Sequence, residues 1–379
     1  MAVKKIAILA DVPLGRIKGL ESYGPPTGHY ATWLEALIPE FEAFPEFEFH
    51  WIIVSKLASQ LTTHQALGQT FHVLPRNRKL VSMLSGYLLE TRKIRTLLQT
   101  IQPDLLHAWG SEDVYGLAGA RSGFKPRVFT LQGCLNECVA RDRSAHWLLR
   151  FQAAFEAPTV RAYDTATGES PIAVSHLQRL NPQISAQLID YGVATTFFDA
   201  KWNPASAPNV LFAGSLNASK GLLDLLDVFE SPHLRNVTLN IAGDGELFDE
   251  IKNLRIPNIR LLGRLSRNDL IPVMEATWGL AIPTHADTGP SILKEARVVG
   301  LPVVTTKAAG ASHYIQSAGC GFVTDPGDRD ALSLAISNMV ATREASIELG
   351  QKGWQHHREL LHPSITAFKL IQLYRSLVA

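Results

Sequence analysis

The segment Asp287–Glu295, DTGPSILKE, places two carboxylates eight positions apart around the start of a predicted helix. Pro290 suits the first helical position, because its missing N–H is not needed there, and Thr288 or Gly289 can cap the helix. The first amides of a helix are available to bind an anion. The residue types and their spacing therefore predict a site for a ligand that carries both hydroxyl groups and negative charge.

Glu295 falls on the apolar side of this helix. At about 100° per residue, Glu295 shares one arc with Ile292 and Val299, whereas Lys294 and Arg297 lie on the other side. An ionised carboxylate that faces a core is costly unless it is paired or hydrogen-bonded. We therefore expect Glu295 to have a definite partner.

Two kinds of partner fit Glu295. One is a set of ligand hydroxyls, and the other is a cation within the fold, such as Lys307 or Arg264. The segment by itself favours neither.

Length and composition describe a globular chain of two domains. Its 379 residues exceed what one hydrophobic core usually supports. Hydrophobic residues make up 46% and charged residues 19%, which is typical of a folded enzyme-sized protein. The formal net charge of +1 gives no strong attraction to polyanions, so nucleic acid is not an expected partner.

Positive charge is nevertheless concentrated in the first half. Between Arg76 and Arg161 there are 13 Lys or Arg against seven Asp or Glu. This excess indicates either solvated helix surface or peripheral contact with an anionic membrane.

The remaining composition points to the cytoplasm. Cys134, Cys138 and Cys320 are too few for a disulfide framework, and no Cys/His grouping has metal-ligand spacing, so no metal is expected. Lys4-Lys5 precedes only five apolar residues, which predicts a first strand and not a signal peptide. No apolar run is long enough to span a bilayer. We expect a cytoplasmic protein, at most peripheral at the inner face of the membrane.

Short β-rich runs alternate with helical patterns, which is typical of parallel sheets with crossover helices. In the first half the predicted strands are 5–10, 47–54, 70–74, 105–108, 127–131, 172–174 and 187–189, and the predicted helices include 28–38, 79–101 and 146–163. In the second half the predicted strands are 209–214, 236–242, 258–262, 278–283, 302–305 and 321–323. The fold class is α/β, with two doubly wound domains and a ligand site at strand ends in the cleft between them.

The predicted domains are 1–200, a Pro-rich linker 201–208, a second domain 209–344 and terminal helices 345–379. The terminal helices carry aromatic residues suited to packing, and we expect them to cross back to the first domain.

Several strand ends of the second half suit phosphate or sugar binding. Lys220 opens a helix after the turn Gly214-Ser215, where a cation could meet a diphosphate. Gly243 either lets backbone approach a ligand or makes a tight turn. Arg264 and Leu265 follow a strand at the level where a nucleobase could lie. In the first half, Gly28 closes a glycine-bearing loop that could cover phosphates.

Taken in order, these pieces resemble the retaining, glycogen-synthase-like glycosyltransferases of GT-B type often called family 4. The resemblance is stronger after residue 209, and it rests on Gly214-Ser215, Lys220-Gly221, Ala242–Gly245, Asp287, Glu295-Ala296, Gly300–Val304 and Gly319–Val323, with weaker support from Tyr191–Val193, Phe197 or Phe198, and Leu106–Gly110.

The resemblance implies roles for these residues. Glu295 would bind the ribose hydroxyls of a nucleotide, Asp287 hydroxyls of the transferred sugar, and Lys220 the diphosphate, with the backbone of Gly289, Pro290 and Ser291 assisting. Gln132 would position the sugar. This sequence departs from the family pattern at three positions, with Asp287 in place of glutamate, Ser215 in place of arginine and Gln132 in place of histidine.

The resemblance implies a retaining, metal-independent glycosyltransferase, with a nucleoside-diphosphate sugar as donor and no cofactor. The expected acceptor is a carbohydrate or glycolipid, as in polysaccharide synthesis, and Arg141, Arg143 and Trp147 are candidates to line its site. Two alternatives keep the architecture. One is a degenerate glycosyltransferase that only binds, and the other is a sugar-nucleotide epimerase.

Overall fold

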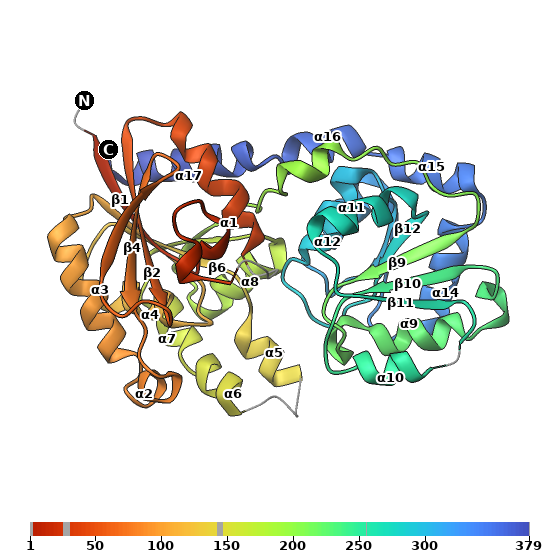
Figure 1. Cartoon of the computed structure of the whole chain (residues 1–379), viewed down its shortest axis with the longest axis horizontal. Coiled ribbons are helices and arrows are strands. Elements are labelled where there is room, and N and C mark those ends of the chain that lie inside the picture. The colour runs from red at the N-terminus through yellow and green to blue at the C-terminus, as the bar shows by residue number, and fades with distance from the viewer. Residues whose placement is uncertain (1–2, 26–30, 142–146, 255, 379) are drawn as a thin grey trace. The chain divides into compact units, whose positions relative to one another are not determined.

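The computed structural model describes residues 3–25, 31–141, 147–254 and 256–378. By its internal contacts the chain divides into unit 1, residues 1–192 with 363–379, and unit 2, residues 193–362. Each unit contains one sheet with helices on both faces (Figure 1). The two doubly wound sheets confirm the predicted α/β fold class.

Unit 1 is built on an eight-stranded sheet in the order β3-β4-β2-β1-β5-β6-β7-β8, in which only β3 runs antiparallel to its neighbour. Its strands are β1 (Lys4–Leu9), β2 (Phe47–Ser55), β3 (Thr62–Ala66), β4 (Gln69–Pro75), β5 (Leu105–Trp109), β6 (Arg127–Leu131), β7 (Thr165–Gly168) and β8 (Ser185–Leu188). Its helices are α1 (Thr32–Leu37), α2 (Lys79–Leu84), α3 (Leu88–Ile101), α4 (Val114–Arg121), α5 (Leu135–Arg141), α6 (Trp147–Ala153), α7 (Glu156–Arg161), α8 (Pro171–Leu180) and α17 (Pro363–Val378).

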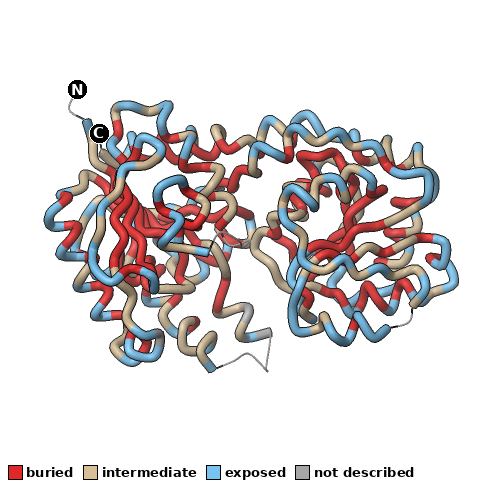
Figure 2. Tube along the Cα trace, in the orientation of Figure 1, coloured by how far each residue is buried: buried red, intermediate tan, exposed pale blue. Residues whose placement is uncertain are grey.

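Both faces of this sheet are buried. Ile6 and Ile8 of β1 pack into the core cluster that includes α1 and α17, while Ala7 and Leu9 pack into the cluster that includes α3 and α4. A near-continuous apolar strand is what a parallel sheet covered on both faces requires. Figure 2 shows buried residues along the strands of each unit.

Unit 2 is built on a six-stranded sheet in the order β11-β10-β9-β12-β13-β14, with every pairing parallel. Its strands are β9 (Asn209–Ala213), β10 (Thr238–Ala242), β11 (Ile259–Gly263), β12 (Gly279–Ile282), β13 (Val303–Thr306) and β14 (Gly321–Thr324). Its α-helices are α9 (Leu222–Phe229), α10 (Phe248–Asn253), α11 (Arg267–Ala276), α12 (Ser291–Val299), α13 (Ser312–Ala318), α14 (Arg329–Met339), α15 (Arg343–Gln351) and α16 (Trp354–Leu360). All six strands predicted here from the sequence are present.

Three predictions for unit 1 are wrong. The predicted helix 146–163 is two helices, α6 and α7, over its described residues. Residues 172–174 lie in α8 and not in a strand, because Ser170 accepts a hydrogen bond from the Ala173 amide and Pro171 occupies the first turn. The predicted helix 79–101 is two helices, since Gly86 and Tyr87 have positive φ and end its regular path. The strands β3 and β7 are additional to the predictions.

The segments at the predicted boundaries have definite neighbours. Within 201–208, the Trp202 indole donates to the carbonyl of Thr277, and the Ala205 carbonyl accepts from the Trp278 indole, so this segment is bonded to unit 2. In unit 1, Tyr374 of α17 contacts Nδ1 of His107 through its hydroxyl at 2.6 Å. The predicted domain bounds, 1–200, 209–344 and 345–379, stay a prediction.

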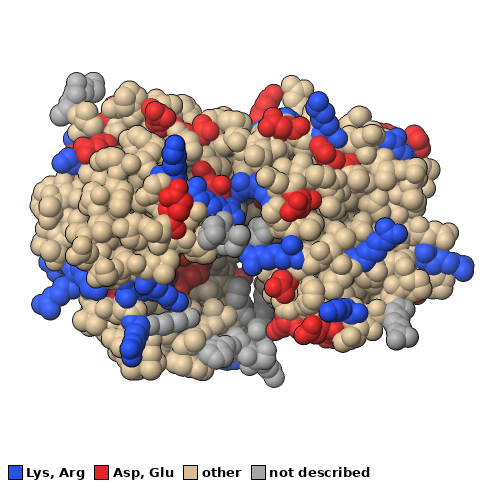
Figure 3. Space-filling view, in the orientation of Figure 1, with Lys and Arg blue, Asp and Glu red and all other residues tan. Residues whose placement is uncertain are grey.

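Charge on the units is mixed. Figure 3 shows basic and acidic side chains on the viewed face of each unit. Among the described residues, no helix is long and apolar enough to cross a bilayer.

Candidate active site

The loops after β9, β10 and β11 are joined backbone to backbone. The Gly214 amide donates to the Ala242 carbonyl at 3.0 Å, and the Gly243 amide donates to the Gly263 carbonyl at 2.8 Å. A Cβ on Gly243 would lie 1.9 Å from the Gly214 oxygen. The glycine is thus required by contact between two loops, which favours the tight-turn interpretation over close approach to a ligand.

This packing yields a stability prediction with a matched control. Gly243 and Gly214 share nearly the same φ, 152° and 155°, but a Cβ on Gly214 would meet nothing within 4 Å. Gly243→Ala is expected to lower the free energy of unfolding by about 2 kcal/mol or more beyond the loss in Gly214→Ala. Denaturant unfolding of both variants measures the difference, and equal losses would contradict the proposed contact.

The turn that carries Lys220 packs against the loop after β12. Lys220 lies in a short turn, capped by the Asn217 side chain, and the Thr284 hydroxyl and the His285 amide both donate to the carbonyl of neighbouring Ser219. Gly221 has φ 71°, and a Cβ there would lie 1.9 Å from the Pro283 oxygen. Only glycine fits this close approach, which brings the Lys220 turn against the loop after β12.

The Lys220 ammonium forms an ion pair with Asp287, a contact between residues 67 positions apart. Both side chains are largely buried, with 26% of Lys220 and 15% of Asp287 exposed. Asp287 also accepts from the Gly289 amide at 3.2 Å, and its own carbonyl accepts from Gly310 at 2.8 Å. The predicted diphosphate cation and the predicted sugar carboxylate therefore neutralise each other in the unliganded protein.

Glu295 lies in the second turn of α12, which begins at Ser291 with Pro290 at the N-cap, one position later than predicted. The side chain is half-buried, and burial raises the pKa of its carboxyl from 4.5 to about 7, opposed by the positive charge of Arg267. Arg267 opens α11 and was not predicted from the sequence. Of the two cations considered as partners, Lys307 instead pairs with Asp325 at 2.9 Å, and Arg264 is exposed.

The helix around Glu295 is buried on more than one side. Lys294 and Arg297, predicted to lie away from the apolar stripe, are 3% and 1% exposed. The Arg297 guanidinium donates to the carbonyls of Leu301, Gly350 and Lys352 and to Nδ1 of His357. Arg297 thereby ties the end of α12 to the segment before α16 and helps to keep the helix in place.

Other predicted donor residues lie on the loops of the same sheet. Ser215, Gly214 and Arg264 are exposed, and Leu265 is half-buried. Gly28 and Arg143 lie outside the described residues, as does the side chain of Arg141. Trp147 is 56% exposed at the start of α6 in unit 1.

Gln132 follows β6 in unit 1 and meets Glu112, which follows β5. An ideal Cβ on Gly110 would lie 2.4 Å from both Gln132 Oε1 and Glu112 Oε2, so the two oxygens share the space above this glycine. Burial, reinforced by the negative charge of Glu156, raises the pKa of Glu112 to about 7. Glu112 Oε2 is buried and has no hydrogen-bond partner among the described residues. Sequence reasoning missed Glu112, although its place after a strand was a signal.

By contrast, the contacts of His107 indicate a structural role. Its Nε2 lies 2.6 Å from the Thr130 hydroxyl, and burial lowers the pKa of the imidazole to about 3, so the ring is neutral.

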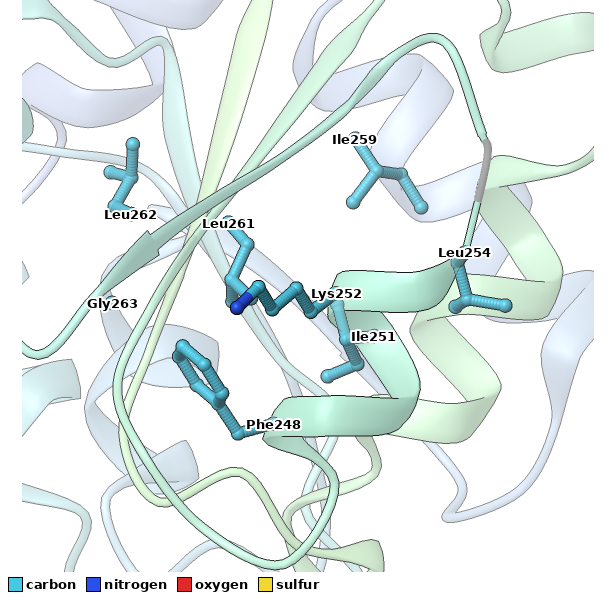
Figure 4. Close-up of a pocket in the computed structure, with 8 residues that line it drawn as sticks. All are labelled: Phe248, Ile251, Lys252, Leu254, Ile259, Leu261, Leu262 and Gly263. Carbon is cyan, nitrogen blue, oxygen red and sulfur yellow. The ribbon is translucent and has the colours of Figure 1, made fainter.

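A pocket of about 360 Å³ opens between α10 and β11 (Figure 4). Six of the eight residues that line it have apolar side chains, among them Phe248, Ile251 and Leu261, and Lys252 is its charged member. Of the predicted donor loops it touches only the strand end at Leu262-Gly263, and the described residues that line it do not include Lys220, Asp287 or Glu295. We therefore assign the candidate site to the ion pair and α12, and not to this pocket.

Comparisons with known proteins give the class first. Over 98% of both chains, the fold matches sucrose-phosphate synthase from Thermosynechococcus elongatus with a TM-score of 0.79 at 16% identity. Anabaena HepE in complex with UDP-glucose matches 98% of this chain and 100% of its own, with a TM-score of 0.70 at 17% identity. The protein has the GT-B fold.

One family resembles the second half of the chain. Residues 195–356, less than half of the chain, match the model of the family "Glycosyl transferases group 1". It is 26% identical to the lipopolysaccharide core biosynthesis glycosyltransferase LpsE of Rhizobium meliloti over 40% of this chain and 44% of that protein. It is 26% identical to the D-rhamnosyltransferase WbpZ of Pseudomonas aeruginosa over 42% of this chain and 43% of that protein. The matches thus span less than half the length of these curated relatives.

Proposed function

We propose that this protein is a retaining glycosyltransferase that moves a sugar from a nucleoside diphosphate to a carbohydrate or glycolipid acceptor. The observation that carries the proposal is the Lys220–Asp287 ion pair, because it brings the one predicted phosphate cation to the loop that leads into α12 and Glu295. A cation, a carboxylate and a helix start then lie together in unit 2. The similarity to the glycosyltransferase LpsE and the D-rhamnosyltransferase WbpZ supports the same reaction class.

In the proposed donor complex, Glu295 accepts hydrogen bonds from the ribose hydroxyls. These donors would stabilise the ionised carboxylate, which the unliganded protein disfavours. The diphosphate draws the Lys220 ammonium, and the released Asp287 carboxylate accepts from hydroxyls of the transferred sugar. Gly289, Pro290 and Ser291 form the backbone beside the phosphates.

Negative charge grows on the leaving diphosphate as the bond to the sugar carbon breaks. Lys220 and the α12 amides would stabilise this charge more strongly in the transition state than in the ground state, which is how binding groups lower a barrier. The departing phosphate oxygen takes the proton of the acceptor hydroxyl, and the new bond forms on the same face of the sugar. No metal ion is needed for this step as proposed.

Unit 1 would supply Gln132, which positions the sugar, and side chains for the acceptor. The oxygens of Gln132 and Glu112 above Gly110 suit sugar hydroxyls, and the orphaned Glu112 oxygen would gain a donor from one of them. Exposed Trp147 offers an apolar ring face for a sugar or lipid. We place the protein in the cytoplasm, in peripheral contact with an anionic membrane that carries a glycolipid acceptor.

A donor screen tests the proposal. One nucleotide sugar among UDP-, GDP- and ADP-sugars is expected to raise the melting temperature, because a ligand that binds only the native state stabilises it. UDP-glucose is the first to try, since HepE binds it. The same donor should release its nucleoside diphosphate when acceptor is present. Failure of every donor to bind would overturn the proposal, and binding with no transfer or hydrolysis would favour a binding protein.

A further inference from the structure

Five large apolar side chains stand in solvent on α2 and the start of α3. They are Leu80, Val81, Leu84, Leu88 and Leu89, each between 43% and 79% exposed, and we call them the leucine surface. Single exposed leucines are ordinary, but five within ten residues need an explanation. Leu80 and Leu84 are one helical turn apart, so they share a face of α2.

Contacts with Glu90 and Tyr87 fix which face of α2 is buried. Ser82 and Met83 are 2% exposed, and the Ser82 hydroxyl donates to the buried carboxylate of Glu90. The Tyr87 amide donates to the Ser82 carbonyl at 2.7 Å, which closes the turn into α3. The helix therefore buries Ser82 and Met83 and leaves its leucines exposed, although an ordinary surface helix buries most of its apolar residues.

The exposed charge within the segment that carries the leucine surface has one sign. Between Arg76 and Ile101 the sequence contains a single acid, Glu90, and it is 2% exposed. Arg78, Arg92 and Arg95 are exposed. Arg92 and Arg95 follow Leu88 by four and seven positions, which places them on the same face of α3. Figure 3 shows basic side chains over the part of unit 1 where Figure 1 places α2 and α3.

Apolar side chains flanked by cations and free of exposed acids match the chemistry of an anionic bilayer surface. Leucines enter the boundary between headgroups and acyl chains, while guanidinium groups bind lipid phosphates. A partner made only of protein would have to offer acids around an apolar groove. A second copy of this surface would bring like charges together, which disfavours self-association through it.

We propose that the leucine surface, with Arg78, Arg92 and Arg95, docks unit 1 onto an anionic lipid membrane. This docking rests on the proposed function, because a glycolipid acceptor would lie in the membrane. Lipid binding itself requires no nucleotide-sugar donor. The membrane contact is thereby assigned to one face of α2 and α3.

Flotation with vesicles tests the proposal. The wild-type protein is expected to float with vesicles of phosphatidylcholine mixed with phosphatidylglycerol, and to bind vesicles of phosphatidylcholine alone at least about tenfold more weakly. High salt should weaken the binding to the anionic vesicles, because the Debye length shortens. Equal binding to both vesicles, or none to either, would overturn the proposal.

Variants locate the contact. The double variant Leu84→Ser and Leu88→Ser should lose about tenfold or more in vesicle binding, and Arg92→Glu with Arg95→Glu should lose as much. Leu334→Ser on α14 is the matched apolar control, since Leu334 is 63% exposed and far along the chain, and Arg235→Glu is the charge control. Equal losses in the controls would contradict the assignment.

Two further measurements separate the outcomes. Thermal unfolding should be the same for the double variants and the wild type, because the altered side chains are exposed. A concentration-dependent dimer that disappears in the Leu84→Ser, Leu88→Ser protein would assign the surface to a second copy and refute lipid docking. Lys220→Ala should bind vesicles as the wild type does, so a failure of sugar transfer and a failure of docking are distinguishable.

Discussion

Glu295→Gln is expected to weaken nucleotide-sugar binding about tenfold to a hundredfold while it stabilises the unliganded protein above neutral pH. A hydrogen bond to a charged group contributes about 1.5–3 kcal/mol, and glutamine keeps the shape of the side chain but loses its charge. Isothermal titration with the donor found by the screen measures the loss. Unchanged affinity would remove Glu295 from the proposed ribose site.

The stability effect has a definite direction. Folding raises the Glu295 pKa from 4.5 to about 7, so the contribution of this carboxyl to stability is fully present below pH 4.5 and is lost as pH rises through 7. Glutamine does not titrate. The variant should therefore match the wild type near pH 4.5 and exceed it by about 1–3 kcal/mol at pH 8. A Glu295→Gln protein less stable than the wild type at pH 8 would mean that the carboxylate has a compensating partner without ligand.

Lys220→Ala is expected to lower the rate of sugar transfer about 100-fold to 1,000-fold. The variant removes a positive charge from the site where charge develops on the leaving diphosphate, and losses of this size follow removal of one such group. It also leaves the largely buried Asp287 without its cation, so some loss of stability should accompany it. Steady-state kinetics and thermal unfolding measure the two effects separately.

Lys307→Ala is the matched control. Lys307 also pairs with an aspartate, and it precedes Ala308, whose carbonyl accepts from the Asp287 amide. Its pair with Asp325 is exposed, with side chains 59% and 63% accessible, so its loss should change stability by at most about 0.5 kcal/mol and leave transfer unchanged. Lys220→Arg should recover part of the activity by restoring the charge. Wild-type turnover in Lys220→Ala would refute the proposed phosphate role.

Much of unit 2 follows from local sequence patterns. The central strands β9, β12 and β13 come from short, mostly apolar runs before turns, and such a run must be buried between two layers of helices wherever the chain goes. The need of Glu295 for a partner is equally local, since the helical period alone places it beside apolar residues. Local signals also misled: the run at 172–174 is β-branched at both ends, but the capping serine and proline before it start a helix.

Contacts between distant segments needed the tertiary structure. Strand order places β12 beside β9, and this neighbourhood brings Lys220 to Asp287. Arg267 faces Glu295 because α11 packs against α12, and Glu112 meets Gln132 because β5 and β6 are adjacent. The burial of Lys294 and Arg297 has the same origin, since helical periodicity describes one helix and not the number of neighbours around it.

The sequence by itself determined the α/β class, the strands of unit 2 and the segment 287–295 as a place for chemistry, because hydrophobic periodicity and turn residues act over a few positions. Only the tertiary structure decided which charges meet, which carboxyls have raised pKa values and which leucines stay in solvent. These properties depend on which parts of the chain exclude water from one another, and that is a property of packing and not of spacing.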